Sequence, residues 1–197
     1  MRVALVERAA EMLARREVVT LRVLVDSVGT STMAVYTHFG GMPGLWRAVR
    51  QEGFTRLSER LALVDATPDA VRDLMALGAA YVRNAVANPY LYRAMFDTVA
   101  DLENPDAADD GFQLLVAGAE RARDTGRFAE SCDPQAVATQ LWAAGHGLVM
   151  LVLTGVLPGE VLAPCATGTA AALFVAAGDE PDRCRQSVND GWTLNDN

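Results

Sequence analysis

A helical repeat of apolar residues runs through almost the whole 197-residue chain, and this feature limits the possible folds most strongly. In successive stretches the apolar positions recur three or four residues apart, as they do along one face of an α-helix. No stretch alternates apolar and polar residues convincingly enough to indicate a β-strand. The pattern therefore predicts an all-α protein with about nine helices.

Capping and turn residues predict a helix-turn-helix near the N-terminus. Thr20 can cap the second helix of the chain, and Gly29 suits the left-handed position just past its end. Ser31 can cap a short third helix over residues 32–38. In a DNA-binding helix-turn-helix the second helix of the motif enters the major groove, and residues 20–39 have the required helix, tight turn and helix.

The rest of the sequence predicts further helices, separated by proline, glycine and acidic residues. The expected segments are helices over residues 68–87, 111–125, 134–157 and 160–177, a short aromatic segment over 90–96, and a polar loop over 101–110. Residues beyond 178 show no period and are expected to form a loosely held polar tail. These expectations divide the chain into a DNA-binding domain (1–50), an effector-binding and dimerisation domain (51–178) and a tail (179–197).

The net charge of −8 argues, taken alone, against nucleic acid as a partner, because an acidic surface repels phosphate. The charges are unevenly placed, however. Residues 1–60 hold nine arginines and six acidic residues, a net charge of +3, whereas the remainder holds eight arginines and nineteen acidic residues. The sequence therefore predicts a small basic module joined to a larger acidic one.

The third predicted helix carries side chains that suit contact with DNA. Val35 and Phe39 lie four residues apart, so both can face inward. The side chains left on the outward face are those of Thr32, Met33, Tyr36, Thr37 and His38. Hydroxyl groups and rings of this kind suit phosphates and base edges, and Arg22 on the preceding helix can reach a phosphate.

Residues 4–50 resemble the N-terminal DNA-binding module of the TetR family of transcriptional repressors. The resemblance rests on Thr20-Leu21-Arg22, on Gly29-Thr30-Ser31-Thr32, and on Ala34-Val35-Tyr36-Thr37-His38-Phe39-Gly40 followed by Leu45. The roles that it implies are a helix cap near a phosphate for Ser31, base contacts for Thr32, Met33 and Thr37, backbone contacts for Tyr36 and His38, and a further contact for Arg22.

Two positions depart from the family pattern. Gly41-Met42-Pro43 stands where the family usually has a lysine that opens the fourth helix, so one phosphate contact is missing. The glycine that usually follows the first helix is absent from Arg16-Glu17-Val18-Val19. We therefore expect weaker or more salt-sensitive DNA binding, with affinity gained through dimerisation.

A second resemblance covers about residues 75–160 and is to the Trp…His-Gly subgroup of TetR regulatory domains. It rests on Leu141-Trp142-Ala143-Ala144-Gly145-His146-Gly147-Leu148 and implies a helical domain that binds an effector and dimerises. The candidates to line a largely apolar ligand pocket are Tyr81, Met95, Phe96, Phe112, Trp142, His146 and Met150. The alternative is that these residues only fill the core and that His146 is a hydrogen-bonded structural residue.

Two long stretches, residues 141–159 and 161–178, contain no charged side chain. Helices of this kind must be buried either in a membrane or against protein. Glycine, proline and histidine within the stretches argue against a membrane. Pairing of the last two helices, about 134–157 and 160–177, with their copies in a homodimer would bury the same surface.

No pattern in the sequence predicts catalysis, a metal or a cofactor. His146 has no nucleophile or carboxylate beside it in a triad, and Cys132, Cys165 and Cys184 lie too far apart for a zinc site. The N-terminal segment lacks the apolar run of a signal peptide, so a cytoplasmic location is expected. The sequence thus predicts a homodimeric repressor that leaves a palindromic operator when a small, largely apolar effector binds. The alternative is a helical small-molecule-binding protein or enzyme that does not bind DNA.

Overall fold

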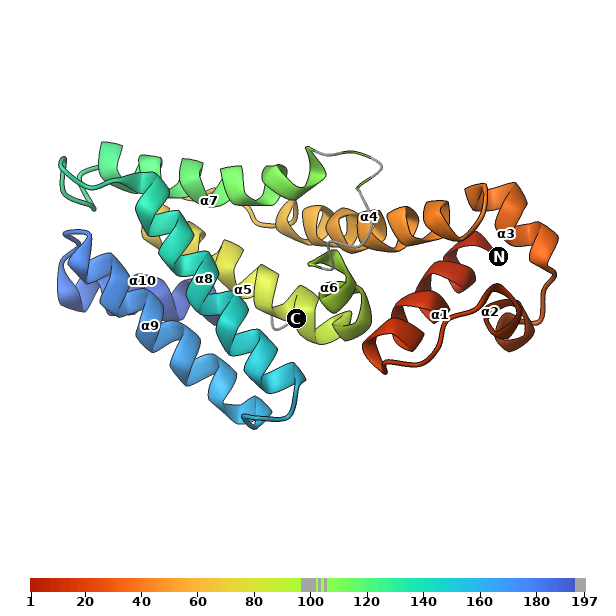
Figure 1. The fold of residues 1–197 in the computed structure, drawn as a ribbon. Coiled ribbons are helices and arrows are strands. Elements are labelled where there is room, and N and C mark those ends of the chain that lie inside the picture. Colours follow the sequence, from red (N-terminus) through yellow and green to blue (C-terminus); the bar gives the residue numbers. More distant parts are fainter. Residues whose placement is uncertain (97–101, 103, 105, 194–197) are drawn as a thin grey trace. The chain divides into compact units, whose positions relative to one another are not determined.

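The computed structural model describes residues 1–96, 102, 104 and 106–193, and the regular structure of this part is entirely helical (Figure 1). The elements are α1 (Arg2–Ala14), α2 (Leu21–Val28), α3 (Thr32–Phe39), α4 (Met42–Leu61), α5 (Ala70–Ala87), α6 (Pro89–Met95), α7 (Ala107–Asp124), α8 (Pro134–Leu153), the short 3-10 helix η1 (Gly159–Val161), α9 (Leu162–Ala176) and α10 (Pro181–Thr193). The predicted all-α class is confirmed, with ten α-helices in the described part of the chain.

Contacts divide the chain into two compact units. The first unit is Met1–Ser58 with Ala87–Ala108, and the second is Glu59–Val86 with Asp109–Asn197. This division differs from the boundary expected at residue 50, because α6 packs with the N-terminal helices. The Arg50 side chain donates a hydrogen bond to the backbone oxygen of Met95 at 2.9 Å. The glycine at position 53 also lets α4 approach Met95 so closely that an added Cβ would lie 2.2 Å from its side chain.

The first unit buries one face of each of its N-terminal helices in a shared core. The largest fully buried side chains there are Leu5, Val6, Met12, Leu24, Val35, Leu45 and Val49. Thr20 caps α2 as predicted, with its hydroxyl accepting a hydrogen bond from the Val23 backbone N–H at 3.3 Å. Gly29 ends α2 at a φ of 72°, in the left-handed region that glycine adopts without strain. The turn before α3 is therefore short and fixed.

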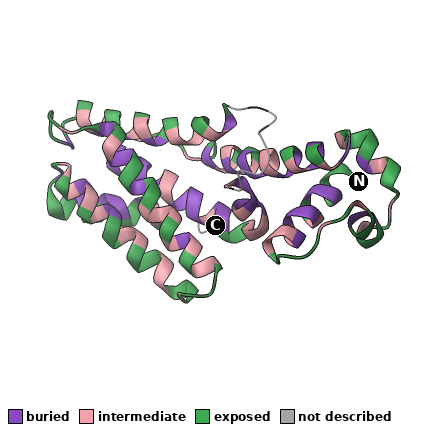
Figure 2. Cartoon of the chain, viewed as in Figure 1, coloured by how far each residue is buried: buried purple, intermediate pink, exposed green. Residues whose placement is uncertain are grey.

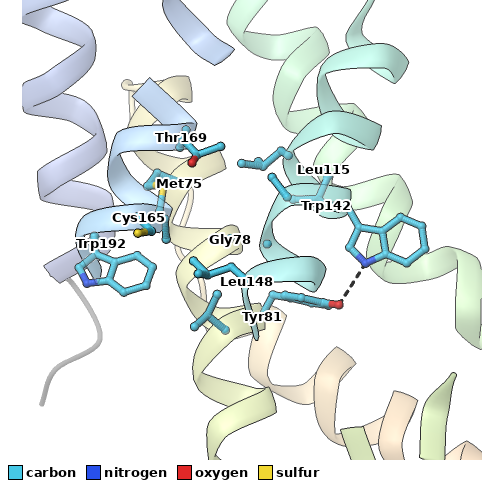
Figure 3. Close-up of a pocket in the computed structure, with 15 residues that line it drawn as sticks. Met75, Gly78, Tyr81, Leu115, Trp142, Leu148, Cys165, Thr169 and Trp192 are labelled. Carbon is cyan, nitrogen blue, oxygen red and sulfur yellow. Dashed lines mark hydrogen bonds between the residues drawn. The ribbon is translucent and has the colours of Figure 1, made fainter. Parts of the chain in front are cut away.

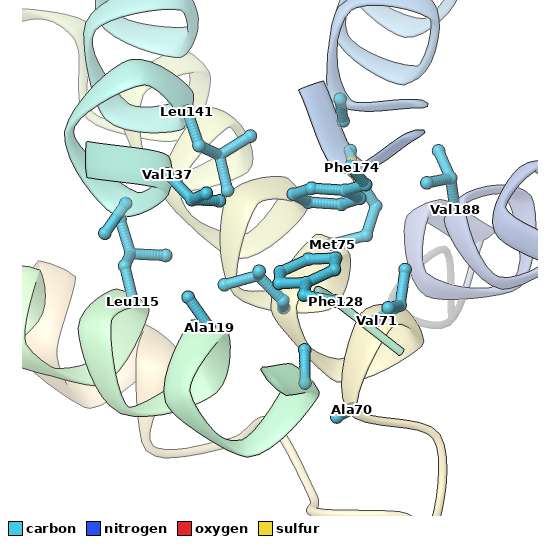
Figure 4. Close-up of a cluster of buried hydrophobic side chains, with 14 of the residues drawn as sticks. Ala70, Val71, Met75, Leu115, Ala119, Phe128, Val137, Leu141, Phe174 and Val188 are labelled. Atoms are coloured by element: carbon cyan, nitrogen blue, oxygen red, sulfur yellow. The ribbon is translucent and has the colours of Figure 1, made fainter. Parts of the chain in front are cut away.

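The core of the second unit lies where α5, α7, α8, α9 and α10 meet (Figure 4). Val71, Leu115 and Val137 contribute to it from α5, α7 and α8. The rings of Phe128 and Phe174 lie 5.6 Å apart between their centres. The unit is thus a helical bundle, and the apolar faces of α5, α7, α8 and α9 were visible in the sequence as separate periodic stretches.

The expected polar tail is wrong for most of its length, because residues 181–193 form α10. Cys184, Ser187 and Val188 are buried, and α10 approaches α5 so closely that a Cβ at Gly191 would lie 2.2 Å from the Arg72 backbone oxygen. The buried face consists mostly of small or weakly apolar residues, so hydrophobic periodicity did not reveal it. Residues 194–197 lie outside the described residues.

A buried ionic cluster connects α10 to the rest of the second unit. Arg127 follows α7, is 4% exposed, and donates hydrogen bonds to both carboxylate oxygens of Asp179 at 2.7 and 2.8 Å. It also donates to Asp69 at 2.6 Å and to the Ser187 hydroxyl at 3.0 Å. Burial raises the pKa of Asp69, but hydrogen bonds from Ser187 and Arg127 outweigh it and leave that pKa below its usual value. The cluster therefore holds three parts of the chain together, the residues before α5, the residues after α7, and α10 with the segment before it, through paired charges and the Ser187 hydroxyl.

Only part of the loop expected over residues 101–110 can be compared with the structure. Residues 97–101, 103 and 105 lie outside the described residues. Residues 107–110 belong to α7, so that part of the prediction is wrong. Asp109 and Asp110 lie in the first turn of α7, where acidic side chains interact favourably with the positive end of the helix dipole.

Helices α8 and α9 leave most of their apolar surface uncovered within one chain (Figure 2). By length and composition, Pro134–Leu153 and Gly159–Ala176 could each cross a membrane. Only 22% of the first apolar window and 11% of the second are buried. Exposed side chains include Leu151 on α8 at 43% and, in the connection between α8 and η1, Val156 at 66%. Surface of this kind indicates contact with another apolar partner.

Candidate functional site

Helix α3 presents the outward face predicted for a recognition helix. Val35 is fully buried and anchors α3 to the first core, while Phe39 is half-buried. The exposed side chains are Thr32, Met33, Tyr36, Thr37 and His38. Met33 is 68% exposed and Tyr36 is 54% exposed. Two large side chains so placed contribute little to folding and are available to a partner.

Ser31 occupies the N-cap position of α3, but its side chain does not cap the helix as predicted. Its backbone is extended, with a φ of −105° and a ψ of 158°, and its hydroxyl makes no capping hydrogen bond. The first N–H groups of α3 therefore have no side-chain cap. An anion such as a phosphate is the ligand that a helix N-terminus favours.

A close backbone approach fixes α3 against the start of α4. A Cβ added at Gly44 would lie 1.7 Å from the Phe39 backbone oxygen, so no other residue fits at that position. The Tyr36 ring lies beside Gly41, 3.5 Å from the position of an added Cβ. The glycine-rich sequence after α3 thus sets the direction in which Tyr36 and its neighbours project.

Arg2, Arg22 and Arg47 of the first unit are exposed, and Arg2 contacts α3. The Arg22 side chain is 90% exposed and only 3.8 Å from Asp26, a loose surface pair that leaves it able to reach a phosphate. Arg2 lies over the Phe39 ring, 5.5 Å from its centre, and Arg47 is exposed on α4. Neither Arg2 nor Arg47 was among the predicted residues. The basic excess of residues 1–60 was the available signal, but spacing alone does not show which cations face the same way.

Four of the seven predicted ligand-binding residues meet in the second unit and form what we call the aromatic cluster: Tyr81, Phe112, Trp142 and His146. The Trp142 indole N–H donates a hydrogen bond to the Tyr81 hydroxyl at 3.2 Å. The same hydroxyl lies 3.2 Å from Nδ1 of His146. The Phe112 and Trp142 rings lie 5.9 Å apart. Burial lowers the pKa of His146, so its imidazole is neutral at pH 7.

Two of the other three predicted residues, Met95 and Phe96, do not join this cluster. Met150 is half-buried on α8. Met95 and Phe96 belong to the first unit, where Phe96 packs edge-on against Phe54 and Tyr92 with ring centres 6.4 and 5.3 Å apart. The sequence analysis placed Met95 and Phe96 in the ligand pocket because nothing in the sequence shows that α6 packs with the N-terminal helices.

A cavity of about 90 Å³ lies in the second unit among α5, α7, α8, α9 and α10 (Figure 3). Of the predicted residues, only Tyr81 and Trp142 line it. The lining also includes Trp192, which the sequence analysis assigned to the tail and therefore missed. No side chain that lines the cavity is charged.

The titratable and thiol groups of the described residues form no metal or redox centre. No group of three or more His, Cys, Asp or Glu residues there is placed to hold a metal ion. Cys132, Cys165 and Cys184 are free thiols. Burial raises the pKa of Cys184 to about 12, so that thiol is protonated and inert at neutral pH.

An exposed recognition helix on a basic module, together with a separate helical unit that encloses an apolar cavity, defines a helix-turn-helix regulator with a ligand-binding domain. Residues 74–176 match the family model described as Tetracyclin repressor-like, C-terminal domain. This match spans more than half of the chain, so the chain belongs to the TetR family. It is a ligand-responsive, DNA-binding transcriptional regulator. The Trp…His-Gly subgroup stays a prediction.

Solved structures share the fold over nearly the whole chain. A protein with unknown function from Rhodococcus sp. RHA1 is 26% identical, with a TM-score of 0.75 over 90% of this chain and 95% of that one. CprB, a TetR family protein from S. coelicolor A3(2), is 23% identical, with a TM-score of 0.72 over 96% and 95%. A gamma-butyrolactone receptor is 18% identical, with a TM-score of 0.74 over 96% and 93%. No curated protein matches the chain significantly.

Proposed function

We propose that this chain is a cytoplasmic, homodimeric repressor that leaves a palindromic operator when a small, largely apolar effector binds. The exposed face of α3 carries the proposal. Met33 offers apolar surface to a thymine methyl, the hydroxyls of Thr32 and Thr37 suit base edges, and the exposed Tyr36 suits the DNA backbone. The exposed side chains of His38 and Arg22 add hydrogen-bond donors for the DNA backbone. The proposal assigns no catalytic role to the chain.

The uncovered apolar faces of α8 and α9 support a homodimer. TetR-family regulators form dimers, and a second copy would bury surface that one chain leaves exposed. Two-fold symmetry would place two copies of α3 about 34–36 Å apart, which is one turn of DNA. The operator is therefore a palindrome in this proposal.

Two equally exposed leucines provide a matched test of the dimer. Leu151 on α8 and Leu114 on α7 are each 43% exposed. Leu151→Arg should convert the protein to monomers in sedimentation velocity, because a buried unpaired charge at an interface is costly. Leu114→Arg should stay dimeric. A wild type that sediments as a monomer, or equal effects of the two changes, would contradict the proposed interface.

The aromatic cluster supports an uncharged effector. Phe112 and Trp142 offer flat apolar surface, and Tyr81 and the neutral His146 offer hydrogen-bonding groups, which is the usual composition of a small-molecule site. One of the similar structures is named a gamma-butyrolactone receptor, and a small uncharged ligand of that kind suits this cluster. The effector would release DNA by binding more tightly to a dimer whose α3 helices no longer match the groove spacing.

Selection of bound sequences from random duplex DNA tests this function. The enriched sites should be palindromes with half-sites whose centres lie about one helical turn apart. Enrichment of a single half-site would contradict the symmetric dimer. Absence of any enrichment at low salt would contradict DNA binding itself.

A further inference from the structure

Helix α3 lacks the side chains that read guanine and adenine most specifically. Bidentate hydrogen bonds to these bases come from arginine, lysine, asparagine and glutamine. None of the four occurs in residues 30–40, which include α3 and both of its cap residues. The exposed Arg2, Arg22 and Arg47 lie on α1, α2 and α4. Helix α3 itself therefore needs another way to distinguish bases.

Two residues of α3 lie almost opposite its buried face. Successive residues are about 100° apart around a helix, so Thr37, two residues from both Val35 and Phe39, points about 160° away from each. Met33 lies two residues before Val35 and one turn before Thr37, on the same stripe. Val35 is fully buried, whereas Met33 and Thr37 are exposed. Met33 and Thr37 therefore project farthest from the core of the first unit.

The two exposed rings of α3 lie to the sides of this stripe. Tyr36 directly follows Val35, and its ring lies beside Gly41, 3.5 Å from the position of an added Cβ. His38 directly precedes Phe39, and the two rings pack edge-on with their centres 6.0 Å apart. These contacts leave the centre of the outward face to Met33 and Thr37.

Met33 and Thr37 each carry a methyl group, which matches one feature of the major groove. Among the groups that base edges present there, only the C5 methyl of thymine is apolar. Contact with it would remove from water apolar surface that the chain itself leaves exposed. The two residues are about 6 Å apart along the helix, so they can reach thymines within about two or three base pairs of each other.

We infer that Met33 and Thr37 read thymine methyl groups, so that base discrimination by α3 depends on the C5 methyl rather than on bidentate hydrogen bonds. This inference rests on the proposed function and specifies the class of operator. Each half-site contains A·T pairs at the positions where α3 enters the groove. A cytosine methylated at C5 presents the same methyl group and fits the same contact.

Uracil substitution tests the inference, because uracil pairs with adenine as thymine does and lacks only the C5 methyl. The probe is the palindrome enriched from random duplex DNA, with each thymine replaced in turn in both half-sites. Fluorescence anisotropy at one salt concentration gives the affinity. One methyl contact contributes about fourfold, so replacement in both half-sites should weaken wild-type binding about fifteenfold at two positions. At these positions, 5-methylcytosine should bind about fifteenfold more tightly than cytosine, each paired with guanine.

Two variants assign the methyl contacts to their residues. Met33→Ala shortens the apolar side chain, and Thr37→Ser removes the methyl of Thr37 while keeping its hydroxyl. Each should weaken binding to the thymine palindrome and lose the difference between thymine and uracil at one of the two positions. Thr55→Ser removes the same methyl from an exposed threonine on α4 and should keep the wild-type response.

The outcomes separate this inference from the proposed function. Equal wild-type binding with uracil at every thymine position would overturn the inference and leave DNA binding established. An enriched palindrome without thymine in its half-sites, or a full response to uracil in both variants, would do the same. Wild-type protein that binds no duplex at low salt would contradict the proposed function and the inference together.

Discussion

The end of α1 gives a sharp test of how this chain departs from its family. Arg16 is the one non-glycine residue with a positive φ in the described part of the chain, at 57°. The Arg16 N–H bonds to the Leu13 oxygen and the Glu17 N–H to the Met12 oxygen, both at 2.9 Å. This is a Schellman ending, and Arg16 occupies the position where glycine is usual.

We expect Arg16→Gly to stabilise the protein. The left-handed conformation costs a non-glycine residue about 1–2 kcal/mol. Glycine removes this strain but raises the entropy of the unfolded chain, which offsets about 0.4–1 kcal/mol. The net gain is about 0.5–1 kcal/mol, or a rise of roughly 1–4 °C in Tm for a chain of this size.

Equilibrium urea unfolding followed by circular dichroism measures the difference, with Arg16→Ala as the control. Alanine removes the same charge and side chain but keeps the strain, so Arg16→Ala should be no more stable than the wild type. If Arg16→Gly is equal to or less stable than Arg16→Ala, the argument from backbone strain is refuted.

The remaining predictions concern the second unit. Arg127→Met leaves Asp179 buried without its partner and should cost about 3–5 kcal/mol of unfolding free energy, whereas Arg123→Met, at an exposed pair, should cost under about 1 kcal/mol in the same urea assay. Burial lowers the pKa of His146 in the folded protein below the unfolded value of 6.5. The stability that the neutral imidazole contributes is therefore complete above pH 6.5 and declines as the pH falls through the folded pKa. The Tm of the wild type should therefore drop between pH 7 and 5 by more than that of His146→Gln, and equal drops would contradict a buried neutral imidazole. Cys184 should react with a thiol reagent only as fast as the protein unfolds, and rapid labelling in native buffer would contradict its burial.

The sequence predicted most strongly those elements whose residues have strict local requirements. Thr20 and Gly29 defined α2 because an N-cap needs a side-chain acceptor and a left-handed end favours glycine. Val35 was correctly expected to face inward because its spacing with Phe39 follows the helical repeat. The position of Ser31 at the N-cap of α3 was predicted correctly, but the capping hydrogen bond is absent, because sequence position alone does not determine whether a hydroxyl bonds to its own helix.

Features that depend on tertiary packing were missed. The buried face of α10 uses Cys184, Ser187 and Gly191, which lack the large apolar side chains that mark a helix in sequence. Its Trp192 consequently went unrecognised as part of a cavity wall. Met95 was wrongly assigned to the ligand pocket, because its apolar character predicts burial but not the core in which it is buried. Such residues are positioned by helix packing, which local periodicity does not encode.

The central claim is that α3 reads DNA, and the salt dependence of binding to the DNA flanking its own gene tests it most directly. The logarithm of the wild-type affinity should fall linearly with the logarithm of salt concentration. Tyr36→Ala with His38→Ala should abolish binding while helicity is kept. Arg22→Ala should lower the slope by about 2 per dimer, one phosphate per subunit, and Arg123→Ala should leave it unchanged. Wild-type protein that binds no such DNA at low salt, or a double variant that binds with the wild-type slope, would contradict the account.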